Sequence, residues 1–386
     1  MLNVKLLQPV KVVCTDNLGQ TLTEICQTEH YRRPLVVTDS FVGSMALVTG
    51  AIAMLESVGI SVAVFDEVKP DPLSGTVTDG VAAFAEHDAD SIIAIGGGSS
   101  MDVARGINIV RVNGGSIIDY TDPAKPIAHC GGMIAVPTTA GTGSEMSNAL
   151  VITDEQTNRK LAVLADPAVS EYAVLNADLM LTLPPKMTIA CGLDAFCHAA
   201  EGYLSNLASP VTDAICEKVM FLLYNYLPRA VADGQDREAR ERVMVASTLA
   251  GWMLNNAGTI AGHSIAHVLG AKYHIVHGEA VGYALPAVME FVAPVREKKV
   301  REIGQILGAV FPQNAPCEQV AIIASRAFKD FRDRMIGLHP FEDYGISEDD
   351  VVSNAQAVVD ERFAGNTPRT IDLAAAQQLL REFGKR

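Results

Sequence analysis

Polar side chains spaced four residues apart mark the part of the chain that is equipped for chemistry. Asp194 and His198 form one pair, His263 and His267 form a second, and His277 follows. On a helix, residues four apart lie on one face, one turn from each other. Carboxylate and imidazole groups make a mixed oxygen and nitrogen ligand set that suits Fe²⁺, Zn²⁺ or a similar ion. The pattern therefore predicts a divalent metal site contributed by at least two helices.

The spacing leaves the roles of the individual histidines open. His263 and His267 are both ligand candidates, or one binds the ion while the other transfers protons. His274 and His277, three residues apart, present the same choice. For each of them the alternative is a buried histidine with a structural role only.

Two glycine-rich loops upstream predict a nucleotide site. Residues 96–100, Gly-Gly-Gly-Ser-Ser, follow an expected strand and open an expected helix, which is the context of a phosphate cradle. Residues 138–144, Thr-Thr-Ala-Gly-Thr-Gly-Ser, also follow an expected strand. Ligands of open α/β sheets bind at such carboxyl ends of strands. The alternatives are a tight turn without ligand for the first loop and a capped helix for the second.

Asp39 and Lys160 are ambiguous from the sequence alone. Asp39 follows an expected strand, where its carboxylate would accept a hydrogen bond from a ribose 2′-hydroxyl and would repel a 2′-phosphate. A helix N-cap is the equal alternative. Lys160 reads by default as a solvated surface lysine.

The elements that must position these groups change in character along the chain. Short apolar, β-branched runs alternate with helical patterns up to about Pro185, which predicts a parallel sheet covered by helices on both faces. Beyond that point nearly every segment has helical period. We expect a Rossmann-like α/β domain over residues 1–185 and an all-helical domain over residues 186–386. The expected strands are 35–38, 62–65, 91–95 and 133–137, and the expected helices of the second domain include 188–204, 213–233, 238–257, 260–269 and 370–383.

Composition narrows the class of protein. The net charge of −15, without a basic cluster, argues against binding to nucleic acid. The seven cysteines are scattered and odd in number, which is typical of a reduced cytoplasmic protein. No uninterrupted apolar run reaches the length of a membrane span, so we expect no membrane segment.

A nucleotide loop in one domain and a metal in the next indicate hydride transfer between a nicotinamide and a substrate in the cleft between the domains. A metal ion would act as a Lewis acid on the oxygen of an alcohol or aldehyde. A nearby histidine would exchange the hydroxyl proton with solvent.

Several long motifs, in one order along nearly the whole chain, resemble the iron-containing, group III alcohol dehydrogenase family, whose two-domain plan is shared with dehydroquinate synthase. The motifs are 96–102 (GGGSSMD), 137–145 (PTTAGTGSE), 192–201 with Asp194, His198 and Glu201, the histidines at 263, 267 and 277, and 366–369 (NTPR).

The resemblance implies an NAD-linked alcohol dehydrogenase or aldehyde reductase that acts on a small alcohol or aldehyde and assembles as a homodimer or larger homo-oligomer. It implies Fe²⁺ or Zn²⁺ on Asp194, His198, His263 and His277, with His267 beside the ion as a proton-relay residue. It places Asp39 at the adenine ribose, which favours NAD over NADP. The remaining nucleotide contacts that it implies are Gly97, Gly98 and Ser99 at the pyrophosphate, and Thr138, Thr139, Thr142 and Lys160 along the nucleotide.

Three other functions compete with this one. A glycerol-dehydrogenase-like polyol oxidoreductase shares the two-domain plan, and a hydroxyacid–oxoacid transhydrogenase keeps its NAD bound through the cycle. A non-catalytic nucleotide-binding module with structural histidines is the alternative from another class. The segment 137–145 favours the group III type over the first of these.

Overall fold

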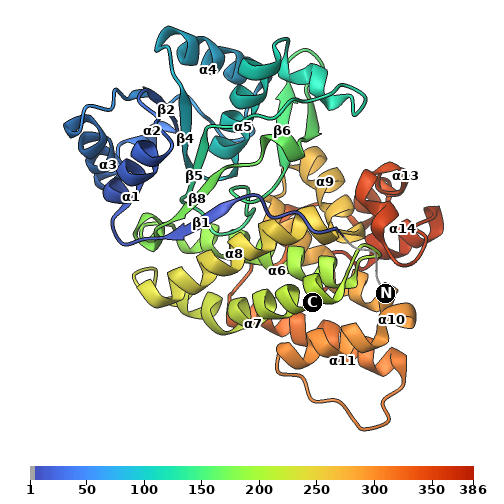
Figure 1. Cartoon of the computed structure of the whole chain (residues 1–386). Coiled ribbons are helices and arrows are strands. Elements are labelled where there is room, and N and C mark those ends of the chain that lie inside the picture. Colours follow the sequence, from blue (N-terminus) through green and yellow to red (C-terminus); the bar gives the residue numbers. More distant parts are fainter. Residues whose placement is uncertain (1–4) are drawn as a thin grey trace. The chain divides into compact units, whose positions relative to one another are not determined.

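The computed structural model describes residues 5–386, so the first four residues of the expected N-terminal domain lie outside it. The chain forms two compact units, an α/β unit and a helical unit (Figure 1). The division near residue 181 falls just before the expected boundary at 185. The α/β unit comprises Gln8–Thr139 and Gly143–Leu181, and the helical unit comprises Thr182–Arg386 with Ala140–Thr142 and residues 5–7.

A six-stranded parallel sheet forms the centre of the α/β unit, with the strand order β1-β8-β5-β4-β2-β3. Ile93 in the middle of β4 pairs with Val36 on one side and Ile134 on the other. All four expected strands are present, whereas β1 and β8 were not expected. The strands are β1 Lys11–Cys14, β2 Pro34–Val37, β3 Ala63–Phe65, β4 Ser91–Gly96, β5 Met133–Pro137 and β8 Tyr172–Leu175.

Helices cover both faces of this sheet, as the sequence predicts. Side chains alternate between the faces along each strand, so Val36 and Ile93 enter one core while Leu35 and Ile92 enter the other. The first core is completed by α1 Leu18–Thr28, α2 Ser40–Gly43 and α3 Ala46–Ser57, and the second by α4 Ser74–Glu86 and α5 Gly98–Asn113.

An antiparallel hairpin, which was not expected, follows β5. It consists of β6 Ala149–Asp154 and β7 Arg159–Leu164. Leu150 and Ile152 are buried while Val151 between them is exposed, so β6 shows the period of two that marks a half-buried strand. That alternation was the available signal.

The helical unit contains the remaining helices, and all five segments expected there are helical. Helix α6 lies at its centre and packs against α7, α8 and α10. The helices are α6 Pro185–Leu204, α7 Pro210–Ala232, α8 Arg237–Ala257, α9 Ala261–Tyr273, α10 His277–Ile306, α11 Cys317–Asp330, α12 Glu348–Val352, α13 Ala355–Asp360 and α14 Leu373–Arg381. Short helical turns are η1 Ile117–Thr121, η2 Asp166–Ala168, η3 Ala177–Met180, η4 Phe331–Met335, η5 Phe341–Tyr344 and η6 Arg362–Asn366.

Burial of α6 follows from its composition. Small and apolar side chains lie on every side of α6, and every residue from Gly192 to Leu204 is buried. A helix that is apolar all round belongs in a core. The three acidic or imidazole side chains that α6 carries there, on Asp194, His198 and Glu201, therefore need partners inside the protein. The predicted fold class, a parallel α/β unit followed by a helical one, is confirmed. In the described chain, no helix has the length and apolar character needed to cross a membrane.

Candidate functional site

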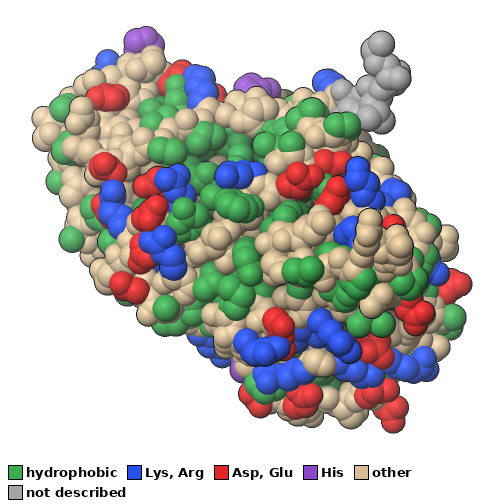
Figure 2. All heavy atoms as spheres, turned by 90° about the horizontal axis from the view of Figure 1, so that it is seen from below, with side chains coloured by type: hydrophobic (Ala, Val, Ile, Leu, Met, Phe, Trp, Pro, Cys, Tyr) green, Lys and Arg blue, Asp and Glu red, His purple; other side chains and the backbone are tan. Residues whose placement is uncertain are grey.

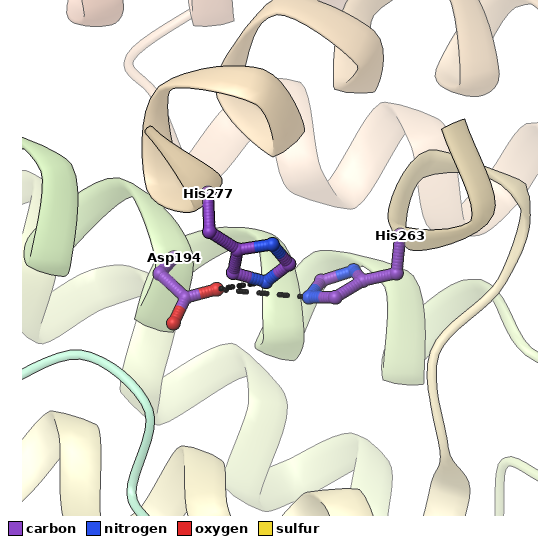
Figure 3. A group of neighbouring side chains, drawn as sticks. All are labelled: Asp194, His263 and His277. Atoms are coloured by element: carbon purple, nitrogen blue, oxygen red, sulfur yellow. Dashed lines mark ion pairs between the residues drawn. The ribbon is translucent and has the colours of Figure 1, made fainter. Parts of the chain in front are cut away.

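The helical unit collects imidazoles around the carboxylate of Asp194. Asp194 and His198 project from the same face of α6, His263 comes from the first turn of α9, and His277 is the first residue of α10. The ligand atoms of Asp194, His263 and His277 all lie within 4.8 Å of one another, and Figure 3 shows their side chains converging. His198 is outside that three-residue group but also approaches the carboxylate.

Asp194 Oδ1 is the common neighbour of three ring nitrogens. It lies 3.4 Å from Nε2 of His277, 3.5 Å from Nε2 of His198 and 3.7 Å from Nε2 of His263. Four ligands held in a tetrahedron at about 2.1 Å from one ion would be about 3.4 Å apart. The distances from Asp194 Oδ1 to the three ring nitrogens are therefore close to those between ligands of one ion.

Hydrogen bonding supports the same interpretation. Asp194 Oδ1 and His263 Nε2 are both buried, and neither has a hydrogen-bond partner among the described residues. Leaving a buried carboxylate oxygen unpaired is costly. A cation between these atoms would compensate both, so the residues present fit a divalent ion of the kind predicted.

The electrostatics keep Asp194 ready to bind a cation. Burial acts to raise its pKa, but the neighbouring His198 and His277 rings hold the pKa well below its usual range, so the carboxylate stays ionised. Burial lowers the pKa of His198 to about 3, although the Asp194 carboxylate acts in the opposite direction. For His263, burial opposes charge, but the carboxylates of Glu201 and Asp194 raise its pKa to about 10. A metal ion that binds this ring would therefore displace a proton from it.

The position of His277 depends on a close contact between two helices. Gly278 follows it in the first turn of α10, and a Cβ at this glycine would lie 1.8 Å from the carbonyl oxygen of Ala190 in α6. A glycine at this position lets the two backbones approach closely. This contact holds the start of α10 directly against the helix that carries Asp194.

His267 lies beside this group. Its ring stacks on that of His277, with centroids 5.4 Å apart, and 38% of its side chain is exposed. Its Nδ1 is 3.1 Å from Oε1 of Glu361, whose other oxygen accepts hydrogen bonds from the Ser264 hydroxyl and the Phe363 amide. Burial lowers the pKa of His267, and Glu361 partly offsets this. Sequence reasoning missed Glu361, which lies far along the chain from His267 and matches no motif.

His274 is placed differently. It is exposed and ends α9 in a left-handed conformation with φ of 56°. Such a residue commonly terminates a helix. The backbone of His274 therefore terminates α9, and this structural role accounts for the residue without a metal ion.

The α/β unit brings most of the expected nucleotide residues to one edge of its sheet. Strands β2, β4 and β5 are neighbours, and their carboxyl ends carry Asp39, the loop from Gly96 to Ser99, and Thr138 with Thr139. Gly97 precedes α5 and Gly98 begins it, with no side chain capping the helix, so its first amides point into the loop region. A Cβ at Gly97 would lie 3.3 Å from the Thr139 hydroxyl.

Asp39 caps helix α2. Its Oδ1 accepts hydrogen bonds from the amides of Phe41 and Val42, at 3.0 and 2.9 Å. The N-cap role that the sequence left open is therefore real. Contact with a ribose remains compatible with it, because the other carboxylate oxygen is not used by the cap.

Two expected nucleotide residues are not brought to this edge by the fold of the α/β unit. Thr142 lies in the segment Ala140–Thr142, which belongs to the helical unit. Lys160 lies on β7 and pairs with Asp71, with Nζ 2.5 Å from Oδ1. Both side chains of this pair are exposed, as expected of a surface lysine.

Comparison with known proteins agrees with this geometry. Residues 9–177 match the family described as iron-containing alcohol dehydrogenase, and residues 188–383 match the C-terminal region of the Fe-containing alcohol dehydrogenase family. This chain belongs to the iron-containing alcohol dehydrogenase family.

Individual relatives cover almost the whole chain. The NAD-dependent methanol dehydrogenase of Bacillus methanolicus is 33% identical over 91% of this chain and 92% of its own length. The lactaldehyde reductase of Escherichia coli K12 is 32% identical over the same shares. An alcohol dehydrogenase from Oenococcus oeni has a similar structure, with a TM-score of 0.91 and 28% identity, over 98% of this chain and all of that one.

Membership in this family confirms three predictions: the family itself, the two-part fold, and an enzyme of the alcohol dehydrogenase type. The iron in the family's description, the NAD in the name of the methanol dehydrogenase, and the cluster of Asp194, His263 and His277 agree with the predicted cofactors. The residue assignments within the site stay predictions.

A methyl group at Gly278 tests the contact that positions His277. The Gly278→Ala variant must push α10 away from Ala190, because the clash is with backbone. We expect a loss of about 1–3 kcal/mol in the free energy of unfolding, as for overpacked cores, together with weaker Zn²⁺ binding by calorimetry. Gly50→Ala in α3, where a Cβ meets nothing within 4 Å, is the control. Wild-type Zn²⁺ affinity in Gly278→Ala would contradict this account.

Proposed function

We propose that the chain binds a divalent metal through Asp194, His198, His263 and His277 and uses it in NAD-linked interconversion of a small alcohol and its aldehyde. The observation that carries this proposal is the buried, unpartnered Asp194 Oδ1 with three imidazole nitrogens 3.4–3.7 Å away. The ion is Fe²⁺ or Zn²⁺, both of which accept such a ligand set. When bound, it supplies a Lewis acid at the substrate oxygen.

His267 is the proposed proton-relay residue. Its ring lies against His277 but does not face Asp194 as the other rings do, and its partial exposure gives it access to solvent. Glu361 accepts from Nδ1, which leaves Nε2 as the nitrogen that takes up or releases a proton. Ser264 and the Phe363 amide hold Glu361 in turn, so the orientation of the ring is fixed.

The nucleotide is proposed to lie at the carboxyl ends of β2, β4 and β5. Gly97, Gly98 and Ser99 offer backbone amides at the positive end of α5 to the pyrophosphate. Thr138, Thr139, Thr142 and Lys160 are the further proposed contacts. Asp39 is proposed to accept from the ribose 2′-hydroxyl through the oxygen that does not cap α2, which selects NAD over NADP.

The proposal extends to the substrate, the assembly and the location of the enzyme. Relatives named for methanol and lactaldehyde indicate a small alcohol or aldehyde. We propose a cytoplasmic location, supported by the seven free cysteines. We also propose a homodimer or larger homo-oligomer, as the family resemblance implies. We propose no nucleic-acid partner, because the net charge is −15. On the face drawn in Figure 2, Asp and Glu side chains border the Lys and Arg side chains.

Metal removal tests the proposed function. Treatment with a chelator should abolish the enzyme's ability to reduce small aldehydes with NADH. Addition of Fe²⁺ or Zn²⁺ should restore this activity. His263→Ala removes a ligand, so we expect at least a 100-fold lower turnover and loss of bound metal by elemental analysis. Full activity in metal-free protein, or unchanged turnover in His263→Ala, would refute the metal-dependent mechanism.

His267→Ala separates the relay from the ligands. General acid–base catalysis contributes about 100- to 10,000-fold to rate, so we expect kcat for alcohol oxidation to fall within that range. Bound metal should stay at the wild-type level, because His267 is not among the proposed ligands. A His267→Ala enzyme that loses its metal would show that this residue is a ligand instead.

Asp39→Ser tests cofactor choice while it preserves the helix cap. A serine hydroxyl still accepts from the first amides of α2, whereas the negative charge is removed. We expect the ratio of kcat/KM for NADPH to that for NADH to rise about tenfold or more, which corresponds to about 1.4 kcal/mol. The thermal midpoint serves as the control for the cap. An unchanged ratio would exclude a role for Asp39 in discrimination.

A further inference from the structure

Glu201 is a carboxylate fully buried in the helical unit, one turn beyond His198 on α6. It lies on the same face as Asp194 and His198. A buried carboxylate without compensation is strongly unfavourable. All of its partners come from one short stretch of chain, the start of α9.

One oxygen of Glu201 caps α9 from another helix. Oε2 accepts the Ile260 amide at 2.7 Å and the His263 amide at 3.2 Å. The N-cap residue of α9, Ile260, has no side chain able to do this. Amides at a helix start need acceptors, and the positive end of the helix stabilises a carboxylate there. Glu201 therefore anchors the start of α9 against α6, and this contact sets the position of His263 along α6.

The other oxygen of Glu201 binds the ring of His263. Oε1 lies 2.9 Å from Nδ1, so this nitrogen carries a proton and donates a hydrogen bond to the carboxylate. The opposite ring nitrogen, Nε2, is buried, lacks a hydrogen-bond partner and lies 3.7 Å from Asp194 Oδ1. The nitrogen that faces Asp194 is thus the one left to bind a cation.

Gly262 makes the arrangement sterically possible. A Cβ at this position would lie 2.2 Å from Oε1 of Glu201. Any other residue would push the carboxylate away from the His263 ring. The contact between Glu201 and His263 therefore requires a glycine at position 262, although Glu201 and Gly262 are on different helices.

We propose that Glu201 is a positioning residue that sets both the place and the tautomer of His263, and that metal affinity depends on it. This inference rests on the proposed metal site. It adds a carboxylate–histidine–metal relation, an arrangement in which the outer partner orients the ring and raises its basicity as a ligand. The Glu201–His263 contact acts through the ring, so Glu201 itself touches neither metal nor substrate.

Glu201→Gln separates the cap from the ring contact. The Gln carbonyl oxygen can still accept the Ile260 and His263 amides, whereas the NH₂ group then faces Nδ1. Two donors cannot face each other, so His263 must present Nδ1 as an acceptor and place its proton on Nε2, where the ion should bind.

The test is a titration of metal-free protein with Co²⁺, followed by the visible absorption of the bound ion. We expect the Kd of Glu201→Gln to be about 10- to 100-fold weaker than wild type, with a changed Co²⁺ spectrum and a near-wild-type thermal midpoint of the metal-free protein. Glu302→Gln is the matched control. Glu302 accepts a hydrogen bond of 2.5 Å from the Tyr203 hydroxyl and does not bond to His263. The Kd of this variant for Co²⁺ should equal that of wild type.

The outcomes distinguish the two proposals. If wild type binds no Co²⁺, the proposed metal site fails. If wild type binds and Glu201→Gln binds equally with the same spectrum, the positioning role is overturned. Should Glu201→Gln not fold, Gly262→Ala replaces it, since it displaces the same carboxylate without changing a polar group. Wild-type affinity and spectrum in a folded Gly262→Ala would likewise overturn the inference.

Discussion

The buried charge of Asp194 is the constraint on which the helical unit depends. A carboxylate this deep in a protein is tolerated only with compensating groups close by. The three imidazoles that supply them come from α6, α9 and α10, and all face one oxygen. Three helices thereby meet at one carboxylate oxygen, which lies 3.4–3.7 Å from a ring nitrogen of each histidine.

Small residues allow the helices to reach that point. Gly278 lets α10 touch the backbone of α6, and Gly262 admits the carboxylate of Glu201 to the start of α9. Glu361 holds His267 in the same way that Glu201 holds His263, through an accepting oxygen at Nδ1. Two histidines four residues apart on α9 are thus oriented by two separate carboxylates, one fully buried and one nearer the surface. This difference in surroundings suits a ligand in the first case and a proton carrier in the second.

The two units contribute different chemistry because their architectures differ. Parallel strands end together at one edge, so the α/β unit offers backbone amides, glycines and hydroxyls suited to phosphates and sugars. Packed helices project side chains inward at intervals of three and four residues, so the helical unit offers a cluster of titratable groups. An alcohol dehydrogenase requires both kinds of surface, one for its nucleotide and one for the reacting oxygen.

Local pattern in the sequence determined much of this protein. The apolar runs located β2 to β5, helical period located α6 to α9, and residue spacing paired Asp194 with His198. Strands β1 and β8 were missed although they are no shorter than β2 and β3. Strand β1 is largely exposed and so lacks the buried apolar run that marks β2. The hairpin of β6 and β7 was missed although its alternation was visible. Only the tertiary structure set His274 apart, since a left-handed helix end leaves no mark in spacing, and only it revealed Glu361 and the role of Glu201. The physical reason is distance along the chain: both carboxylates act on residues of α9 from other elements, and no local periodicity encodes such contacts.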